Sequence, residues 1–152
     1  MSEKVKFDHI GMLVKDRDAA VKHLQMMPDA GEPTYVDEIL FDEKCVKVGK
    51  PFAIKGANIV VGGVEYEVIE VVPEKSEGSY MMKRLEAYGE GLHHIAYHYD
   101  KLEDMENMAE TLKKAGYTVG HQAVVPFMGK MAYVYYFDAP SGGLSFEIKY
   151  FG

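Results

Sequence analysis

The chain has 152 residues, 47% hydrophobic and 27% charged, which is the composition of a folded globular protein. Its net charge of -7 excludes a general nucleic-acid binder, because such proteins need a positive field to displace the counterions of phosphates. The single cysteine, Cys45, excludes an intrachain disulfide and a thiolate metal cage. No segment has the roughly 18 apolar residues of a membrane-spanning helix. The start, MSEKVKFDHI, lacks a signal-peptide pattern, so we expect a cytoplasmic protein.

The first half of the chain predicts a strand, a helix and further strands. Phe7 to Val14 is typical of a strand, and the acidic segment from Asp16 to Met27 is typical of a helix. Residues 29–50 mix turn formers with short apolar runs, and we assign no element to them. Strand-like segments then follow at GKPFAIK, GANIVVGG and VEYEVIE.

The second half predicts the same kinds of element after a connector at residues 73–91, which includes a helix over 80–88. Apolar residues recur at three-and-four spacing between Leu102 and Leu112, and Gly116 follows as a stop. Residues 101–116 are therefore predicted to form a helix. The strand-like segments of this half are LHHIAYHY, YTVGHQAVV, MAYVYYFD and LSFEIKY.

The two halves repeat one plan. FDHIGMLV resembles LHHIAYHY, which aligns His9 with His94, and VEYEVIE resembles LSFEIKY, which aligns Glu67 with Glu147. Each half thus has the order β, α and about three strands, and a duplication within one domain explains this. The domain, residues 1–152, then divides into module one at about 5–72, the connector at 73–91 and module two at about 92–152.

The four aligned residues form a candidate metal site. Strand alternation places Glu67 and Glu147 on the face opposite their apolar neighbours, and His9 and His94 also lie on strands. If the modules pack about a pseudo-twofold axis, the four side chains converge on one cavity. Two imidazoles and two carboxylates suit a divalent Zn, Co, Ni, Mn or Fe ion and leave room for water or a chelating substrate, as in a catalytic site.

Each of these residues, taken alone, has a more ordinary explanation. A single histidine on a strand is more often hydrogen-bonded or exposed, and a glutamate on a two-faced sheet usually belongs to its wet face. The repetition favours the metal site, because one histidine and one glutamate recur at matching positions. Glu67 is the least distinct of the four, since Glu65 shares its face and Glu70 lies nearby.

The repeated segments resemble a known superfamily. DHIGMLVKD, YEVIEVV, GEGLHHIAYHYD and SGGLSFEI are similar to the βαβββ modules of vicinal-oxygen-chelate proteins, which include lactoylglutathione lyase (glyoxalase I), methylmalonyl-CoA epimerase, fosfomycin-resistance proteins and extradiol dioxygenases. The resemblance spans nearly the whole chain. It implies an α+β fold in which two tandem modules form a curved, half-open mixed barrel around one metal ion. It also implies that His9, Glu67, His94 and Glu147 hold that ion.

The resemblance also narrows the expected activity. Dioxygenases and fosfomycin-resistance proteins lack a fourth ligand at the position of Glu67, whereas isomerase-type members keep all four. The turn in DAPSGGLSFE is nearer the Gly-Gly turn of methylmalonyl-CoA epimerases than the Asp-Pro-Asp-Gly turn of lactoylglutathione lyases. Residues 29–50, however, do not clearly match the segment that supplies the epimerase's second base. We therefore expect a metal-dependent isomerase or epimerase that abstracts a proton next to a carbonyl, most like methylmalonyl-CoA epimerase.

Two carboxylates are candidates for the proton transfer. By resemblance Glu147 is the base, and an epimerase needs a second acid on the opposite face of the substrate. Glu43 is our candidate for that second group, with Glu38 as the other choice. For either one, a solvated loop charge is the ordinary explanation.

Three further side chains are assigned to the substrate pocket. His98 lies four residues beyond His94, on the same strand face, and can contact substrate or a metal ligand. Tyr133 and Tyr135 share one strand face and are expected in the pocket wall, although aromatic strand residues more often belong to the core.

Two alternative functions stay open at this point: a lactoylglutathione lyase-type enzyme, and a non-catalytic small-molecule-binding protein of the same fold. The expected partner is a small molecule, either an acyl-CoA or a glutathione-type thioester. Unpaired edge strands favour association, so we also expect a homodimer, with the modules paired within one chain or exchanged between two.

Overall fold

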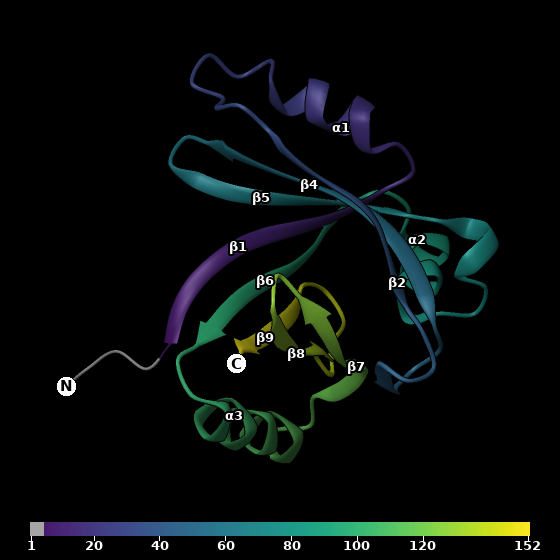
Figure 1. The fold of residues 1–152 in the computed structure, drawn as a ribbon, viewed down its shortest axis with the longest axis vertical. Helices are drawn as coiled ribbons and strands as arrows, with labels where there is room; N and C mark the ends of the chain where they lie inside the picture. Colours follow the sequence, from purple (N-terminus) through teal and green to yellow (C-terminus); the bar gives the residue numbers. More distant parts are fainter. Residues whose placement is uncertain (1–4) are drawn as a thin grey trace. The chain divides into compact units, whose positions relative to one another are not determined.

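The computed structural model describes residues 5–152; residues 1–4, part of the segment considered for a signal peptide, lie outside the described residues. Within this range no helix is long and apolar enough to cross a membrane. The elements, in chain order (Figure 1), are β1 (Val5–Val14), α1 (Arg17–Leu24), β2 (Thr34–Phe41), β3 (Val46–Val48), β4 (Phe52–Val61), β5 (Val64–Val71), the 3-10 helix η1 (Pro73–Lys75), α2 (Tyr80–Tyr88), β6 (Gly91–Tyr99), α3 (Leu102–Lys114), β7 (Thr118–Phe127), β8 (Lys130–Asp138) and β9 (Ser145–Phe151).

The chain divides into two compact units. Residues 9–40 and 50–93 form the module-one unit, and residues 5–8, 41–49 and 94–152 form the module-two unit. Each unit combines parallel and antiparallel strand pairs with helices, so the predicted α+β class and the repeated βαβββ order are confirmed.

The module-one unit is built on strands in the order β2-β4-β5-β1. β4 and β5 form an antiparallel hairpin whose turn, Gly62 and Gly63, has positive φ at both residues, a conformation that glycine adopts without strain. β1 runs parallel to β5. Helix α1 lies along β4 and β5 (Figure 1), and Val21 packs there with Val14 and Val68. The apolar side of β5 thus faces the helix, as the sequence pattern predicts.

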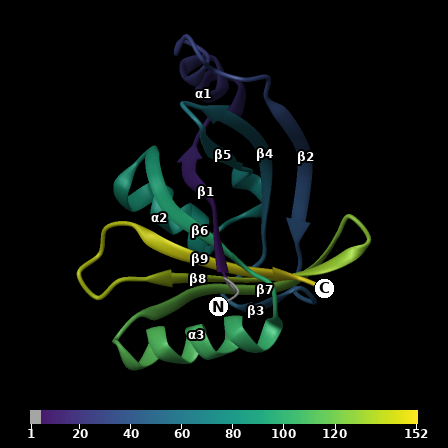
Figure 2. The ribbon, with the colours of Figure 1, turned by 90° about the vertical axis from the view of Figure 1, so that its left-hand side faces the viewer.

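The module-two unit has strands in the order β6-β9-β8-β7-β3. β6 and β9 are parallel, while β7, β8 and β9 are successively antiparallel. Figure 2 shows α3 lying along this set of strands, and a hydrophobic core of the unit forms beneath it. That core contains Tyr99, Met105, Ala109, Leu112, Tyr135, Phe137 and Ile148.

The unassigned segment, residues 29–50, contains two strands that sequence patterns did not reveal. β3 has only three residues and pairs with β7 of the module-two unit, with Val46 opposite Ala123. The turn before it is held by the Asp42 side chain, which accepts hydrogen bonds from the backbone N–H groups of Lys44 and Cys45. A hydrogen bond with the Cys45 side chain, followed by the one from the Cys45 backbone, lowers the pKa of the Asp42 carboxyl. A short strand whose partner is distant in sequence leaves no periodic signal of its own.

The connector between the modules is ordered and contains the predicted helix. Ser79 caps α2 by accepting a hydrogen bond from the Met82 backbone N–H, and Gly89 follows the helix with a positive φ. The buried Ser76 hydroxyl bonds to both backbone groups of Ala53 on β4. The connector therefore packs against the module-one unit, to which it belongs.

Candidate metal centre

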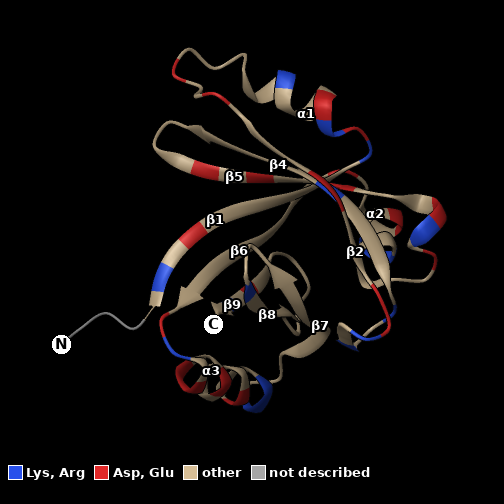
Figure 3. Ribbon diagram, viewed as in Figure 1, with Lys and Arg blue, Asp and Glu red and all other residues tan. Residues whose placement is uncertain are grey.

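The first candidate ligand pair lies on neighbouring parallel strands of the module-one unit. β1 places Gly11 directly opposite Glu67 of β5, and His9 is two residues earlier on the same face as Gly11. His9 Nε2 lies 3.5 Å from Glu67 Oε1. His9 is buried, whereas Glu67 keeps a quarter of its side chain exposed. Figure 3 shows acidic residues along β5, the strand that carries Glu67.

The second pair repeats this arrangement in the module-two unit. β6 places Ala96 opposite Glu147 of β9, and His94 is again two residues earlier. His94 Nε2 lies 3.3 Å from Glu147 Oε2. Here both side chains are buried, at 0% and 4% exposure. The next residue, Ile148, points into the core beneath α3, so the glutamate faces away from the helix.

The donor set fits a divalent cation. His9, Glu67, His94 and Glu147 each offer a nitrogen or a carboxylate oxygen of the kind such ions take. Burying a carboxylate beside an imidazole is costly in a dry site unless its charge is compensated, and a bound cation compensates it. Both pairs therefore have the chemistry of metal ligands.

A lysine accompanies the second pair. Lys149, two residues after Glu147 on the same strand face, is only 12% exposed. Its Nζ lies 2.7 Å from Asp8 Oδ2 and 4.0 Å from Glu147 Oε1. The ammonium is thus shared between two carboxylates, and the closer one, Asp8, precedes the ligand His9 in the chain. Lys149 is therefore an ion-paired, largely buried lysine of this face.

The tyrosines predicted for the pocket wall lie elsewhere. Tyr135 is buried in the core beneath α3, and its hydroxyl donates a hydrogen bond of 2.8 Å to Glu106 of that helix. Burial, with Glu106 adding to it, raises the pKa of Tyr135. Tyr133 packs against the same core. Their side chains point to the helix, away from the face of Glu147, so the expectation for both is corrected.

Tyr136, rather than Tyr133 or Tyr135, lies on the strand face of Glu147. It lies directly opposite Glu147 in the β8–β9 pair, and its ring meets that of His94 edge-on at 5.0 Å. The sequence alone does not distinguish Tyr136 from Tyr133 and Tyr135. The register of β8 against β9 is needed to show which ring lies on the face of Glu147. A shift of one residue exchanges the two faces of a strand.

The two candidates for a second base are both peripheral. Glu43 is exposed in the turn between β2 and β3. Glu38 lies on β2 and forms an ion pair with Lys75 of η1. A role for Glu43 in proton transfer stays a prediction.

His121 of β7 should make the stability of the protein depend on pH. It is buried beside the rings of Phe41 and Tyr136, and burial lowers its pKa to about 4 from the ordinary 6.5. Between these values the unfolded chain binds a proton that the folded chain does not. The contribution to stability is therefore complete above the unfolded pKa and is lost as pH falls towards the folded one.

We expect protonation of His121 alone to lower the unfolding free energy by about 2 kcal/mol as the pH falls from about 7 to about 4.5. Urea unfolding across that range measures the loss, and His121→Phe, which suits the aromatic surroundings, should flatten the curve. An identical pH dependence in the variant would contradict the assignment.

Comparison with known proteins places the chain in a superfamily. Residues 8–136 match the family model of the Glyoxalase/Bleomycin resistance protein/Dioxygenase superfamily, and the chain belongs to it. The recognition of a vicinal-oxygen-chelate protein is thereby confirmed. No curated protein sequence matches the chain.

Several solved structures share the fold. A hypothetical protein from Bacillus halodurans C-125 is 22% identical, with a TM-score of 0.61 over 97% of this chain and 95% of that one. Methylmalonyl-CoA epimerase from Mycobacterium tuberculosis is 19% identical, with a TM-score of 0.58 over 95% and 86%. A methylmalonyl-CoA epimerase in complex with methylmalonyl-CoA and NH4+ is 21% identical, with a TM-score of 0.54 over 97% and 95%. At these identities the likeness concerns the fold.

Proposed function

We propose that this protein is a divalent-metal-dependent isomerase or epimerase that abstracts a proton next to a carbonyl, most like methylmalonyl-CoA epimerase. The observation that carries the proposal is the pair of equivalent histidine–glutamate contacts, one in each unit, at 3.5 and 3.3 Å. Each of these residues lies on the strand face turned away from its helix, outside the hydrophobic core that packs beneath the helix.

We propose that both histidine–glutamate pairs bind the same metal ion. His9 and Glu67 from one unit, with His94 and Glu147 from the other, are proposed to hold a single ion, as the superfamily resemblance implies. When bound, a divalent ion of this kind would act as a Lewis acid towards a carbonyl oxygen of the substrate. The four protein groups would hold the ion and leave room for water or substrate.

Glu147 is the proposed general base. Its carboxylate would take the proton from the carbon next to the carbonyl and return it, and its burial excludes the water that would otherwise compete. The Lys149 ammonium, paired with Asp8, lies 4.0 Å from the Glu147 carboxylate and places a positive charge beside it. Epimerization also needs a proton donor on the other face, for which Glu43 is the proposal.

The proposed substrate is an acyl-CoA. It is supported by the fold shared with methylmalonyl-CoA epimerases and by the Gly-Gly turn before β9, where Gly142 and Gly143 both have positive φ. Turnover of methylmalonyl-CoA, compared with that of the hemithioacetal of methylglyoxal and glutathione, tests the choice against a lyase. Activity on neither substrate, with no exchange of an α-proton, would favour a non-catalytic binding protein.

The metal site has a direct test. Metal analysis of the purified protein should find one divalent ion per chain, and added metal at about 100 times its Kd should raise the unfolding free energy by about 2.7 kcal/mol. His9→Ala and Glu147→Gln should abolish both effects, since each removes a ligand. His23→Ala, an exposed histidine on α1, is the matched control.

Stoichiometric metal in both ligand variants would refute the proposed site.

We also propose that the protein is a homodimer, because edge strands favour association between chains. Sedimentation velocity of the same preparation measures the oligomeric state.

A further inference from the structure

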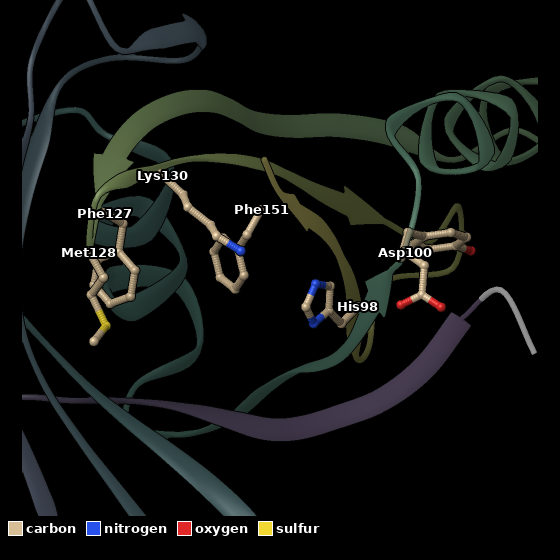
Figure 4. A pocket seen from close by; sticks show the side chains of 7 residues that line it. His98, Asp100, Phe127, Met128, Lys130 and Phe151 are labelled. Atoms are coloured by element: carbon tan, nitrogen blue, oxygen red, sulfur yellow. The ribbon is translucent and has the colours of Figure 1, made fainter.

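A cavity of about 400 Å³ lies within the module-two unit, beyond the second ligand pair on the same side of the sheet. Its size falls within the range of small-molecule sites. Figure 4 shows Met128 and Lys130 at one end, His98 beside Phe151 in the middle, and Asp100 at the other end. His98 is on the strand face of His94, so the cavity continues the surface on which Glu147 lies.

The floor of the cavity is aromatic. The rings of Phe127 and Phe151 are stacked, with centroids 6.1 Å apart and an interplanar angle of 25°. The His98 ring meets Phe151 edge-on at 5.1 Å. Such a surface favours a flat ring, which can stack on one phenylalanine and meet the other groups with its edge.

Met128 is an unusual residue for its position. It is the first residue of the two-residue turn between β7 and β8, followed by Gly129, and both have positive φ, at 50° and 78°. Turns of this kind favour Asn-Gly, and a non-glycine residue with positive φ is otherwise strained. Met128 is also 88% exposed, so it gains little from packing. A strained, exposed methionine at the rim of an aromatic cavity indicates contact with a ligand, because the thioether adapts well to planar rings.

The charged groups of the cavity favour an anion at the Met128 end. Lys130 begins β8 next to this turn and lines the cavity. Lys149, in contrast, is paired with Asp8, so its charge is compensated within the protein. The carboxylate of Asp100 lies at the opposite end, and a ligand's negative charge is best placed away from it.

We propose that this cavity binds a small carboxylate that carries a flat aromatic ring. Its ring lies against Phe127 and Phe151 under the Met128 side chain, and its carboxylate accepts hydrogen bonds from Lys130 and His98. The site goes beyond the proposed metal-dependent reaction, because none of these groups is a proposed metal ligand. It shares with that reaction only His98, which the sequence assigned to the substrate pocket.

Binding to the full-length protein can be measured by titration calorimetry and saturation-transfer NMR, with phenylacetate as the probe and neutral phenylacetamide as its partner. Phenylacetate should bind saturably, about tenfold more tightly than the amide, because charge-assisted hydrogen bonds are the stronger ones. Lys130→Met should remove that difference while leaving the amide unchanged. Lys114→Met, an exposed lysine at the end of α3, should keep it.

Met128→Asn provides a second test, because it should stabilise the fold and at the same time weaken binding. Asparagine suits the turn, so the midpoint of thermal unfolding should rise, while both probes should bind several-fold more weakly because the thioether contact is lost. Met26→Asn, an exposed methionine in the module-one unit, should not weaken binding. Absence of saturable phenylacetate binding would overturn the proposal, and so would binding that is unchanged in both the Lys130 and the Met128 variants.

Discussion

Glu147→Gln is expected to lower turnover by at least about 10²- to 10⁴-fold, because the amide cannot accept the substrate proton and the proposed metal site loses one ligand. The substitution keeps the size of a side chain that is almost completely buried, so the fold should persist. The rate is measured on methylmalonyl-CoA, and independently as exchange of the α-proton with solvent deuterium. The exchange assay reports the proton transfer even if the product is not the expected epimer.

A suitable control is Glu86→Gln, since Glu86 is exposed on α2. It should retain the parent rate. Because Glu147 is also a proposed metal ligand, the metal content of the variant must be measured in parallel. An unchanged exchange rate in Glu147→Gln would exclude this residue as the base.

Phe137→Ala should lower the unfolding free energy by about 3–5 kcal/mol. The Phe137 ring has no exposed surface and lies at the centre of the core beneath α3, where Met105 and Ile148 also pack. Its loss therefore leaves a cavity that rigid strands cannot readily fill. Urea unfolding followed by circular dichroism measures the change.

The comparison variant is Leu92→Ala, because Leu92 lies on β6 with more than half of its side chain exposed. Its effect should remain within about 0.5 kcal/mol, as is usual for surface positions. Equal losses in the two variants would contradict the position of the core described here.

The repeated plan of the fold could be predicted from the sequence because its signals are local. The helix at Leu102–Lys114 follows from apolar spacing within one segment, and the strand at Ser145–Phe151 follows from alternation and from its match to the end of the first half. The same match identified His9 with His94 and Glu67 with Glu147. The structure brings each histidine close to the glutamate of its own half, because the two lie on neighbouring parallel strands, a pairing that the sequence did not predict.

Features that depend on partners distant in sequence could not be predicted. Tyr133, Tyr135 and Tyr136 are alike in composition, and only the pairing of β8 with β9 decides which ring meets His94. His121 likewise shows no sequence signal for its burial. In both cases the position of a side chain is set by the register of neighbouring strands, which local patterns do not encode.

The pairing of β3 with β7 bears on how such a protein could have arisen from a half-length ancestor. Residues 46–48 lie in the first half of the chain, yet they complete the edge of the sheet that carries the second half. A duplicated gene whose halves were wholly self-contained would not need this contribution. The two halves are therefore unequal: without residues 46–48, the strands of the second half would leave the β7 edge open to pairing with other chains.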